Sequence, residues 1–133
     1  MYEFVRVRSQ KDQARYKYIF DIDGNAWSGR FKWLLSSHAL IFKSTVYPEW
    51  LMPWVHYIPI QIDFSDLWDT LVFFRGDLKG DNNHEDLARK IASAGRDWSR
   101  TFWRKEDMTA YNYSFPGVCP DYEHRSRSNV LFP

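Results

Sequence analysis

Residues 21–32, DIDGNAWSGRFK, combine charged and small residues as an anion-binding turn requires. Ser28, Arg30 and Lys32 follow a segment typical of a buried strand and stand where the next helix is expected to begin. The amide groups at a helix start, the positive end of the helix dipole and a guanidinium group all favour a bound diphosphate. Gly24 would let the backbone approach such a ligand closely. The segment therefore predicts a phosphate site.

The same segment also admits a purely structural interpretation. Ser28 would then only cap the helix, and Arg30 would pair with Asp21 or Asp23. In the binding interpretation, the Asp23 carboxylate instead accepts a hydrogen bond from a ribose or sugar hydroxyl. The segment has neither Gly-x-Gly-x-x-Gly nor a Walker pattern, which argues against dehydrogenases and P-loop proteins. The spacing by itself leaves both interpretations open.

A second candidate group lies in and after PWVHYIPI, residues 53–60. Strands of an open α/β sheet present side chains to the crevice outside their carboxyl ends, so His56 and Tyr57 could face a ligand, with His56 bonding a phosphate oxygen. A histidine between aromatic residues can equally be a hydrogen-bonded core residue. Asp63 and Ser65 come at the next helix start, where they could contact the same ligand or only shape the cap.

Other kinds of chemistry have little support. No two histidines have the short spacing of a metal site, and Asp21 with Asp23 is only a weak oxygen pair, so we expect no metal and no cofactor. The single cysteine, Cys119, lies in a segment without periodicity, which argues against a catalytic thiol. The 18 basic and 17 acidic residues leave a net charge of +1, so no nucleic acid partner is expected.

The length and composition fit one folded domain. The 133 residues are 44% hydrophobic and 26% charged, which indicates a packed core rather than a disordered chain. No apolar run reaches the roughly 18 residues that a membrane-spanning helix needs. Residues 1–18 lack the apolar centre of a signal peptide. We therefore expect neither a membrane span nor a targeting signal in this sequence.

The elements that must position the candidate residues form a strand–helix–strand unit. Residues 16–22 predict a buried strand, residues 28–37 a helix that ends in two serines, and residues 39–43 a second strand. Two parallel strands joined by one helix are neighbours with a right-handed crossover. The expected fold class is therefore α/β, a Rossmann-like domain of three layers.

The rest of the chain predicts further elements of the same kind. Residues 55–62 are β-rich, but a proline limits any strand there to a short one. A helix capped by Ser65 follows at residues 66–74, and the longest helical pattern covers residues 84–104. From residue 112 on, prolines and scattered charges predict an irregular tail.

The stretch YKYIFDIDGNAWSGRFKWLLSSHALIFKS, followed by PWVHYIPI, resembles the family 90 glycosyltransferases, the capsule-associated, Rumi-like and protein O-glucosyltransferase group, especially its fungal members. The resemblance covers about residues 16–111. It implies the C-terminal, donor-binding half of a GT-B fold, which takes a sugar, commonly glucose or xylose, from a UDP-sugar without an obligatory metal. The implied partners are the UDP-sugar and a protein or glycan acceptor.

The resemblance also implies roles for individual residues. The family's Gly-x-x-x-Ser-x-Arg-Phe run falls on this segment, where Arg30 resembles the arginine that neutralises the donor diphosphate. The family's Trp-Val-His-Tyr-x-Pro segment falls on residues 54–59. No catalytic residue is assigned. The predicted donor-binding residues are Asp23, Gly24, Ser28, Arg30, Phe31, His56, Tyr57 and Asp63.

The family's N-terminal domain, with the acceptor groove and a carboxylate that resembles a catalytic base, has no counterpart in this sequence. We expect a basic lead at residues 1–15, a partial donor-binding domain at residues 16–111 and an irregular tail at residues 112–133. The expected activity is sugar transfer by a partial enzyme. The alternative is a noncatalytic nucleotide-sugar-binding remnant or an aromatic-rich interaction module. The family's compartment is the secretory pathway, in the endoplasmic reticulum or Golgi.

Overall fold

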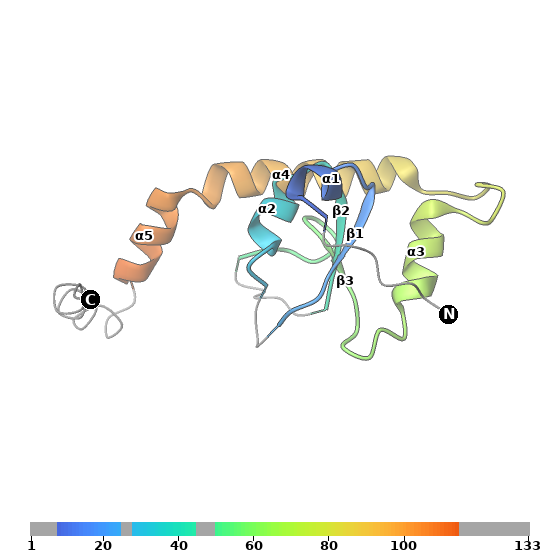
Figure 1. Ribbon diagram of the computed structural model, residues 1–133, viewed down its shortest axis with the longest axis horizontal. Coiled ribbons are helices and arrows are strands. Elements are labelled where there is room, and N and C mark those ends of the chain that lie inside the picture. Colours follow the sequence, from blue (N-terminus) through green and yellow to red (C-terminus); the bar gives the residue numbers. More distant parts are fainter. Residues whose placement is uncertain (1–7, 25–27, 45–49, 115–133) are drawn as a thin grey trace. The chain divides into compact units, whose positions relative to one another are not determined.

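The computed structural model of the chain describes residues 8–24, 28–44 and 50–114. The chain divides into two compact units, one ending at Arg100 and the other beginning at Thr101. The first unit contains the sheet and the helices that pack on it, and the second contains the last helix (Figure 1). The candidate residues all belong to the first unit.

Three strands form a small parallel sheet in the order β1-β2-β3. Their bounds are Tyr18–Asp21 for β1, Leu40–Lys43 for β2 and Ile58–Pro59 for β3. The ladder between β1 and β2 ends with Asp21 opposite Lys43. β3 stops at Pro59, which cannot donate a ladder hydrogen bond. The predicted parallel pairing of the first two strands and the short third strand are confirmed.

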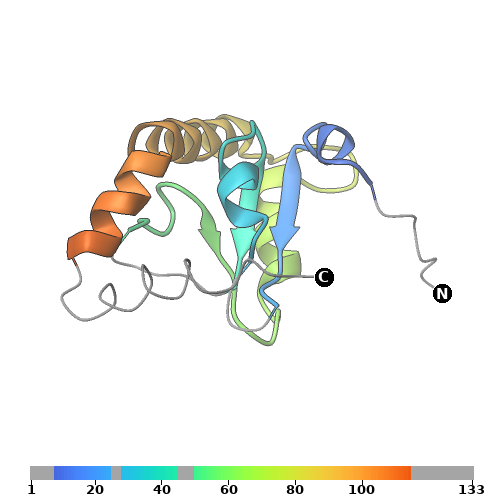
Figure 2. The same cartoon turned by 60° about the vertical axis from the view of Figure 1, so that its left-hand side comes forward.

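Helices cover the sheet on both faces. The helices of the described residues are α1 Gln10–Gln13, α2 Phe31–Leu35, α3 Leu67–Arg75, α4 Glu85–Phe102 and α5 Lys105–Ser114. α2 lies on one face of the sheet and α3 on the other, while α4 crosses the end at which the strands begin (Figure 1, Figure 2). The first unit is therefore α/β with three layers and a parallel sheet, as predicted.

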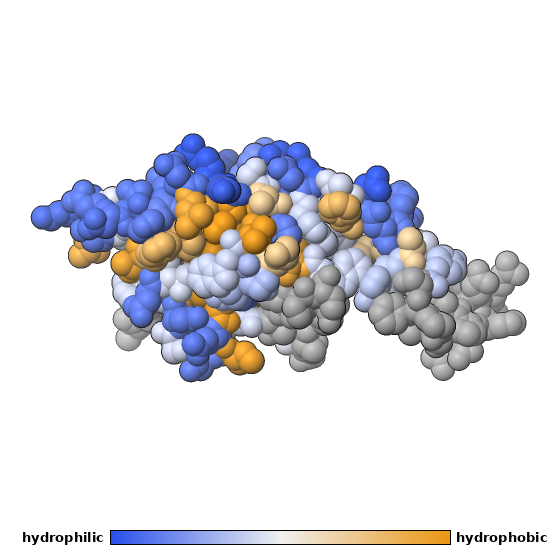
Figure 3. Space-filling view, turned by 180° about the vertical axis from the view of Figure 1, so that it is seen from behind, coloured by the Kyte–Doolittle hydropathy of each residue, from blue (hydrophilic) through white to orange (hydrophobic). Residues whose placement is uncertain are grey.

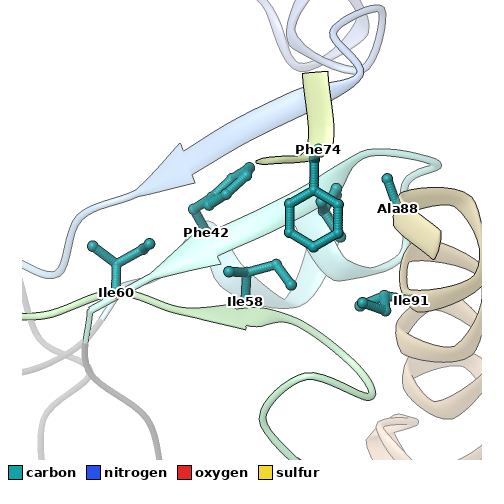
Figure 4. Packing of buried hydrophobic residues seen from close by; sticks show 7 residues of the cluster. Phe42, Ile58, Ile60, Phe74, Ala88 and Ile91 are labelled. Atoms are coloured by element: carbon teal, nitrogen blue, oxygen red, sulfur yellow. The ribbon is translucent and has the colours of Figure 1, made fainter. Parts of the chain in front are cut away.

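The main hydrophobic core lies between the sheet and the helices α3 and α4. Its buried members are Leu40, Phe42, Ile58, Ile60, Phe74, Ala88 and Ile91. Figure 4 shows the rings of Phe42 and Phe74 meeting in this core, and their centroids are 6.2 Å apart in an edge-to-face arrangement. Tyr18 and Phe20 pack against the same cluster, so alternate residues of β1 face the core.

The opposite face of the sheet is covered by α2. Phe31 and Leu35 of this short helix are buried, as is Ile41 of β2. Because successive residues of a strand point to opposite faces, the strand ends Asp21 and Lys43 lie on this α2 side. The fold thus brings an acidic and a basic side chain next to each other beside the first helical turn.

α4 closes the end of the sheet at which the strands begin. A Cβ atom added to Gly95 would lie 2.3 Å from the carbonyl oxygen of His56 and 2.9 Å from Leu35 Cδ1. Only a glycine permits this approach of the helix to the neighbouring backbone. The hydroxyl groups of Ser36 and Ser99 hydrogen-bond at 2.8 Å, which links α2 to α4.

α2 is shorter than the sequence predicts. It begins at Phe31 instead of Ser28, and Arg30 occupies the cap position without a side-chain capping bond. The Ser28 hydroxyl donates to Asp21 Oδ1 at 2.8 Å, so it is tied to β1 rather than to the helix start. The two serines after Leu35 donate to helix carbonyl groups and end the helix as predicted.

Three other bounds also differ from the predictions. Ser65 does not cap α3, because its hydroxyl donates to Asp63 Oδ1 at 2.8 Å and Asp66 takes the cap position. α4 ends at Phe102, two residues before the predicted end at residue 104. α5 extends to Ser114, so residues 112–114 are helical rather than irregular. The rest of the predicted tail, with Cys119, lies outside the described residues.

Several large apolar side chains of the first unit remain exposed. They include Trp68, Val72 and Phe73 of α3 and Trp54 in the loop before β3. Figure 3 shows an apolar area on the side of the molecule that faces away from the viewer in Figure 1. Within the described ranges, no helix is long and apolar enough to cross a membrane.

Candidate functional site

The carboxyl ends of β1 and β2 carry a buried pair of opposite charges. Asp21 and Lys43 are the last partners of the ladder, and the Lys43 ammonium group donates to Asp21 Oδ2 at 3.1 Å. The Asp21 side chain is 0% exposed and the Lys43 side chain 5%. Charges buried this deeply are tolerated only when they are paired, because their desolvation is costly. The pair is therefore a fixed part of the fold.

Two further charged residues extend this pair. Lys43 also donates to Asp23 Oδ1 at 2.5 Å, and its ammonium group lies 4.7 Å from the centroid of the Phe31 ring. Arg30 Nη2 donates to Asp21 Oδ1 at 3.0 Å. We call Asp21, Asp23, Arg30 and Lys43 the ion cluster. Its two carboxylates and two cations balance each other, so the ion cluster has no net formal charge.

Ser28 connects Asp21 to Arg30, the exposed member of the ion cluster. Its hydroxyl donates to Asp21 Oδ1 and accepts the backbone N–H of Arg30 at 3.3 Å. The predicted structural alternative, a pair between Arg30 and Asp21, is thus present. The Arg30 side chain nevertheless remains 47% exposed. A guanidinium group has five N–H donors, and within the described residues only Nη2 is bonded to a side chain, so the pair leaves donors for an anion.

One carboxylate oxygen of the ion cluster has no partner. Asp23 Oδ1 accepts from Lys43, but Asp23 Oδ2 is buried and accepts no hydrogen bond from the described residues. The Asp23 side chain is 10% exposed. Leaving a buried acceptor without a donor costs about 1–3 kcal/mol. An additional donor at this position would therefore bind favourably.

His56 lies in the turn before β3, so the expectation that it and Tyr57 follow the carboxyl end of a strand is wrong. The His56 ring is hydrogen-bonded at one nitrogen. Its Nδ1 accepts the N–H of Met52 at 3.0 Å, which places the proton of the neutral ring on Nε2. Burial lowers the pKa of His56, so the neutral form is favoured. The ring packs against Trp98 with centroids 5.8 Å apart. These contacts match the packed alternative for His56, and its predicted role at a phosphate stays a prediction.

Tyr57 is a core residue by its surroundings. It is 1% exposed and lies edge-on to Phe31, with ring centroids 6.3 Å apart. Burial raises the pKa of Tyr57 to about 12. Phe31 also contacts the Lys43 ammonium group with its ring face. Tyr57 therefore packs against a ring that in turn contacts the ion cluster.

Asp63 lies in the loop between β3 and α3. The backbone N–H and the hydroxyl of Ser65 donate to Asp63 Oδ1 at 3.1 and 2.8 Å, and these bonds lower the pKa of Asp63. Gly24 lies exposed in the turn directly after Asp23. The structure thus joins the predicted residues Asp23, Ser28, Arg30 and Phe31. Within the described residues, no hydrogen bond or ion pair connects His56 or Asp63 to them.

Lys43 is the member of the site that sequence reasoning missed. It ends the predicted strand at residues 39–43, where a terminal lysine is readily taken as solvated. Parallel pairing brings the strand ends Asp21 and Lys43 together, but the predicted strands at residues 16–22 and 39–43 left this register open.

The described part of the chain offers no metal site. It contains no group of three or more His, Cys, Asp or Glu side chains that could ligate a metal ion. A hollow of about 130 Å³ lies between the start of β1 and α4, with Lys17, Glu85 and Arg89 at its lining. It is at the opposite end of the sheet from the ion cluster.

The fold and the site define an α/β protein with a half-exposed arginine at the carboxyl end of a parallel strand, where ligands of such sheets bind. The family model of glycosyl transferase family 90 matches residues 2–116. The chain therefore belongs to glycosyl transferase family 90, as the sequence resemblance indicates.

Curated relatives carry related names. Protein O-glucosyltransferase 1 of Rattus norvegicus is 36% identical over 106 residues, which are 75% of this chain and 25% of that protein. The Mus musculus protein of the same name is 34% identical over 125 residues, 90% of this chain and 29% of that protein. The O-glucosyltransferase LpsA of Dichelobacter nodosus is 29% identical over 110 residues. The chain thus spans about a quarter to a third of the length of these relatives.

Proposed function

We propose that this chain is the donor-binding part of a UDP-sugar-dependent protein O-glucosyltransferase, in which Arg30 contacts the donor diphosphate. Family membership and the names of the relatives support the class of reaction and favour glucose, with xylose as the other sugar implied by the resemblance. The observation that carries the proposal is the state of Arg30, whose Nη2 is fixed on a buried carboxylate while 47% of the side chain stays exposed. A cation held in this way meets an anion with little reorganisation.

The proposed chemistry uses Arg30 as an electrostatic partner. When a sugar leaves a nucleotide diphosphate, the bond between the anomeric carbon and the phosphate oxygen breaks, and negative charge accumulates on the departing UDP. A positioned guanidinium group stabilises this charge through charge-assisted hydrogen bonds. No cofactor is part of the proposal.

Other parts of the enzyme would supply the acceptor groove and the catalytic base. The matched segment is 25% of the rat relative, which leaves most of that protein to form them. We propose that the first unit is half of a GT-B fold, and its exposed side chains Trp68, Val72 and Phe73 are compatible with a further contact surface. A protein acceptor and the secretory pathway follow from the resemblance to the Rumi-like group.

Titration of the chain with UDP tests the role of Arg30. Because a charge-assisted hydrogen bond contributes about 1.5–3 kcal/mol, we expect Arg30→Ala to weaken UDP roughly ten- to a hundredfold. Arg30→Lys keeps the charge but not the planar guanidinium group, so its affinity for UDP should lie between those of wild type and Arg30→Ala. Uridine, which has no phosphate, should bind all three proteins equally. Thermal melting of each variant shows whether it is folded.

Equal affinity of wild type and Arg30→Ala for UDP would overturn the proposal, and a melting temperature lowered without any change in affinity would assign Arg30 to stability alone. A sugar-transfer assay then separates an enzyme from a noncatalytic nucleotide-sugar-binding remnant. UDP binding without transfer, also after extension of the chain to the length of its relatives, would favour the remnant.

A further inference from the structure

The ion cluster contains one carboxylate oxygen that the proposed diphosphate contact does not use. Its two carboxylates offer four oxygen atoms, and three are occupied. Asp21 Oδ1 accepts from Ser28 and Arg30, Asp21 Oδ2 accepts from Lys43, and Asp23 Oδ1 accepts from Lys43 as well. Asp23 Oδ2 is buried and has no hydrogen-bond donor within the described residues.

The position of this free oxygen is fixed. Lys43 is 5% exposed and is held by Asp21 and by the Phe31 ring, so its ammonium group cannot follow a rotation of the Asp23 carboxylate. With Oδ1 tied to Lys43, Oδ2 can obtain a donor only from outside the ion cluster. A side chain nine-tenths buried that keeps one unpaired oxygen is an incomplete hydrogen-bond network.

We propose that Asp23 Oδ2 is the acceptor site for a hydroxyl group of the ligand whose phosphates contact Arg30. The inference rests on the proposed function and adds to it the chemical group that Asp23 recognises. A carboxylate can only accept hydrogen bonds, so its partner must be an O–H or N–H group. The phosphates themselves are excluded, because they are anionic acceptors.

The connectivity of the ion cluster places this acceptor near the diphosphate site. Asp23 is linked to Arg30 through three consecutive ion pairs, from Asp23 to Lys43, from Lys43 to Asp21 and from Asp21 to Arg30. A nucleotide sugar carries hydroxyl groups on both sides of its diphosphate, on the ribose and on the sugar. Both sources present the same chemistry to Asp23, and the experiment distinguishes them.

Calorimetric titration of wild type and Asp23→Asn with three ligands tests the inference. The ligands are UDP, its 2′,3′-dideoxy analogue and UDP-glucose. Asn keeps the size of the side chain but removes the charge, which changes the affinity for every anionic ligand alike. The informative quantities are therefore the ratios of affinities between ligands within one protein.

A hydrogen bond to a charged acceptor corresponds to about a ten- to hundredfold change in affinity. If the hydroxyl belongs to the ribose, Asp23→Asn loses a preference of this size for UDP over the dideoxy analogue. If it belongs to the sugar, the variant loses the preference for UDP-glucose over UDP instead. Asp69→Asn, an exposed carboxylate of α3, is the matched control and should keep both ratios.

Unchanged ratios in a folded Asp23→Asn protein would overturn the inference, including the case in which all ligands gain or lose affinity equally. The outcome for the proposed function is read separately from Arg30→Ala. If Arg30→Ala weakens UDP and the ratios are unchanged, only the inference about Asp23 fails. If wild type binds none of the three ligands, both fail.

Discussion

The two ends of the parallel sheet are built from different kinds of side chain. At the carboxyl end, β1 and β2 finish in Asp21 and Lys43, and the ion cluster surrounds them. At the amino end, α4 crosses the sheet and contributes Ala88 and Ile91 to an apolar core. Buried charge pairs surround the strand ends Asp21 and Lys43, whereas apolar contacts surround Ala88 and Ile91.

This difference separates stability from recognition. At the amino end, around Ala88 and Ile91, a substitution changes side-chain packing and should act chiefly on the folding equilibrium. At the carboxyl end a substitution changes the charge balance around Arg30, which is 47% exposed. Variants of the amino end should therefore alter the free energy of unfolding, and variants of the carboxyl end should alter affinity as well.

Gly95→Val should have the largest effect on stability. The added Cβ would lie 2.3 Å from the His56 carbonyl oxygen, and backbone cannot yield as a flexible side chain can. We expect a loss of more than about 4 kcal/mol or failure to fold. Circular dichroism with urea unfolding measures it. Ser93→Ala, on an exposed position of the same helix, is the control and should stay within about 0.5 kcal/mol of wild type.

Lys43→Met is the corresponding test at the charged end. It leaves Asp21 Oδ2 and Asp23 Oδ1 without a donor, and an uncompensated buried charge costs about 3 kcal/mol. Urea unfolding at neutral pH should show this loss. Lys32→Met removes an exposed lysine of α2 and should change stability by less than about 0.5 kcal/mol. Equal stability of the two variants would show that the ion cluster is not required for the fold.

The sequence predicts the apolar half of this comparison well. The spacing of Leu87, Ile91 and Ala94 predicts a long helix, and the structure has α4 there. Short β-branched and aromatic runs predict the strands, and the connecting helix predicts their parallel pairing. These features depend on periodicity and side-chain volume, both of which are readable along the chain.

The charged half is predicted only in part. Asp21, Asp23, Ser28 and Arg30 are recognisable as a group, but their partners depend on strand register, which no local pattern contains. Lys43 joins the group only because it lies opposite Asp21. Ser28 and Ser65 were wrong as helix caps for the same reason, since each hydroxyl has a competing acceptor, on Asp21 and on Asp63.

The free energy of unfolding should depend on pH through His56, with a smaller effect than the two preceding variants. Burial lowers the pKa of His56 below its unfolded value, so the unfolded chain binds more protons near pH 6. Stability is then fully present above the ordinary histidine pKa and falls as the pH drops through it. His56→Gln keeps an acceptor for the Met52 N–H and should flatten this part of the profile. Urea unfolding of wild type and His56→Gln between pH 5 and pH 8 measures the free energy of unfolding at each pH. Parallel pH profiles of the two proteins would contradict the assignment.

Ser65→Ala should have the smallest effect and sharpens the contrast between two carboxylates. The Asp63 carboxylate is exposed and accepts two bonds from Ser65, whereas the Asp23 carboxylate is buried with one oxygen unpaired. Loss of the hydroxyl should raise the pKa of Asp63 toward its ordinary value, while the remaining Ser65 N–H bond keeps part of the lowering. A carboxyl NMR titration measures this shift. The melting temperature should not change, because Asp66 and not Ser65 stands at the start of α3, and a clear drop would restore Ser65 as its cap.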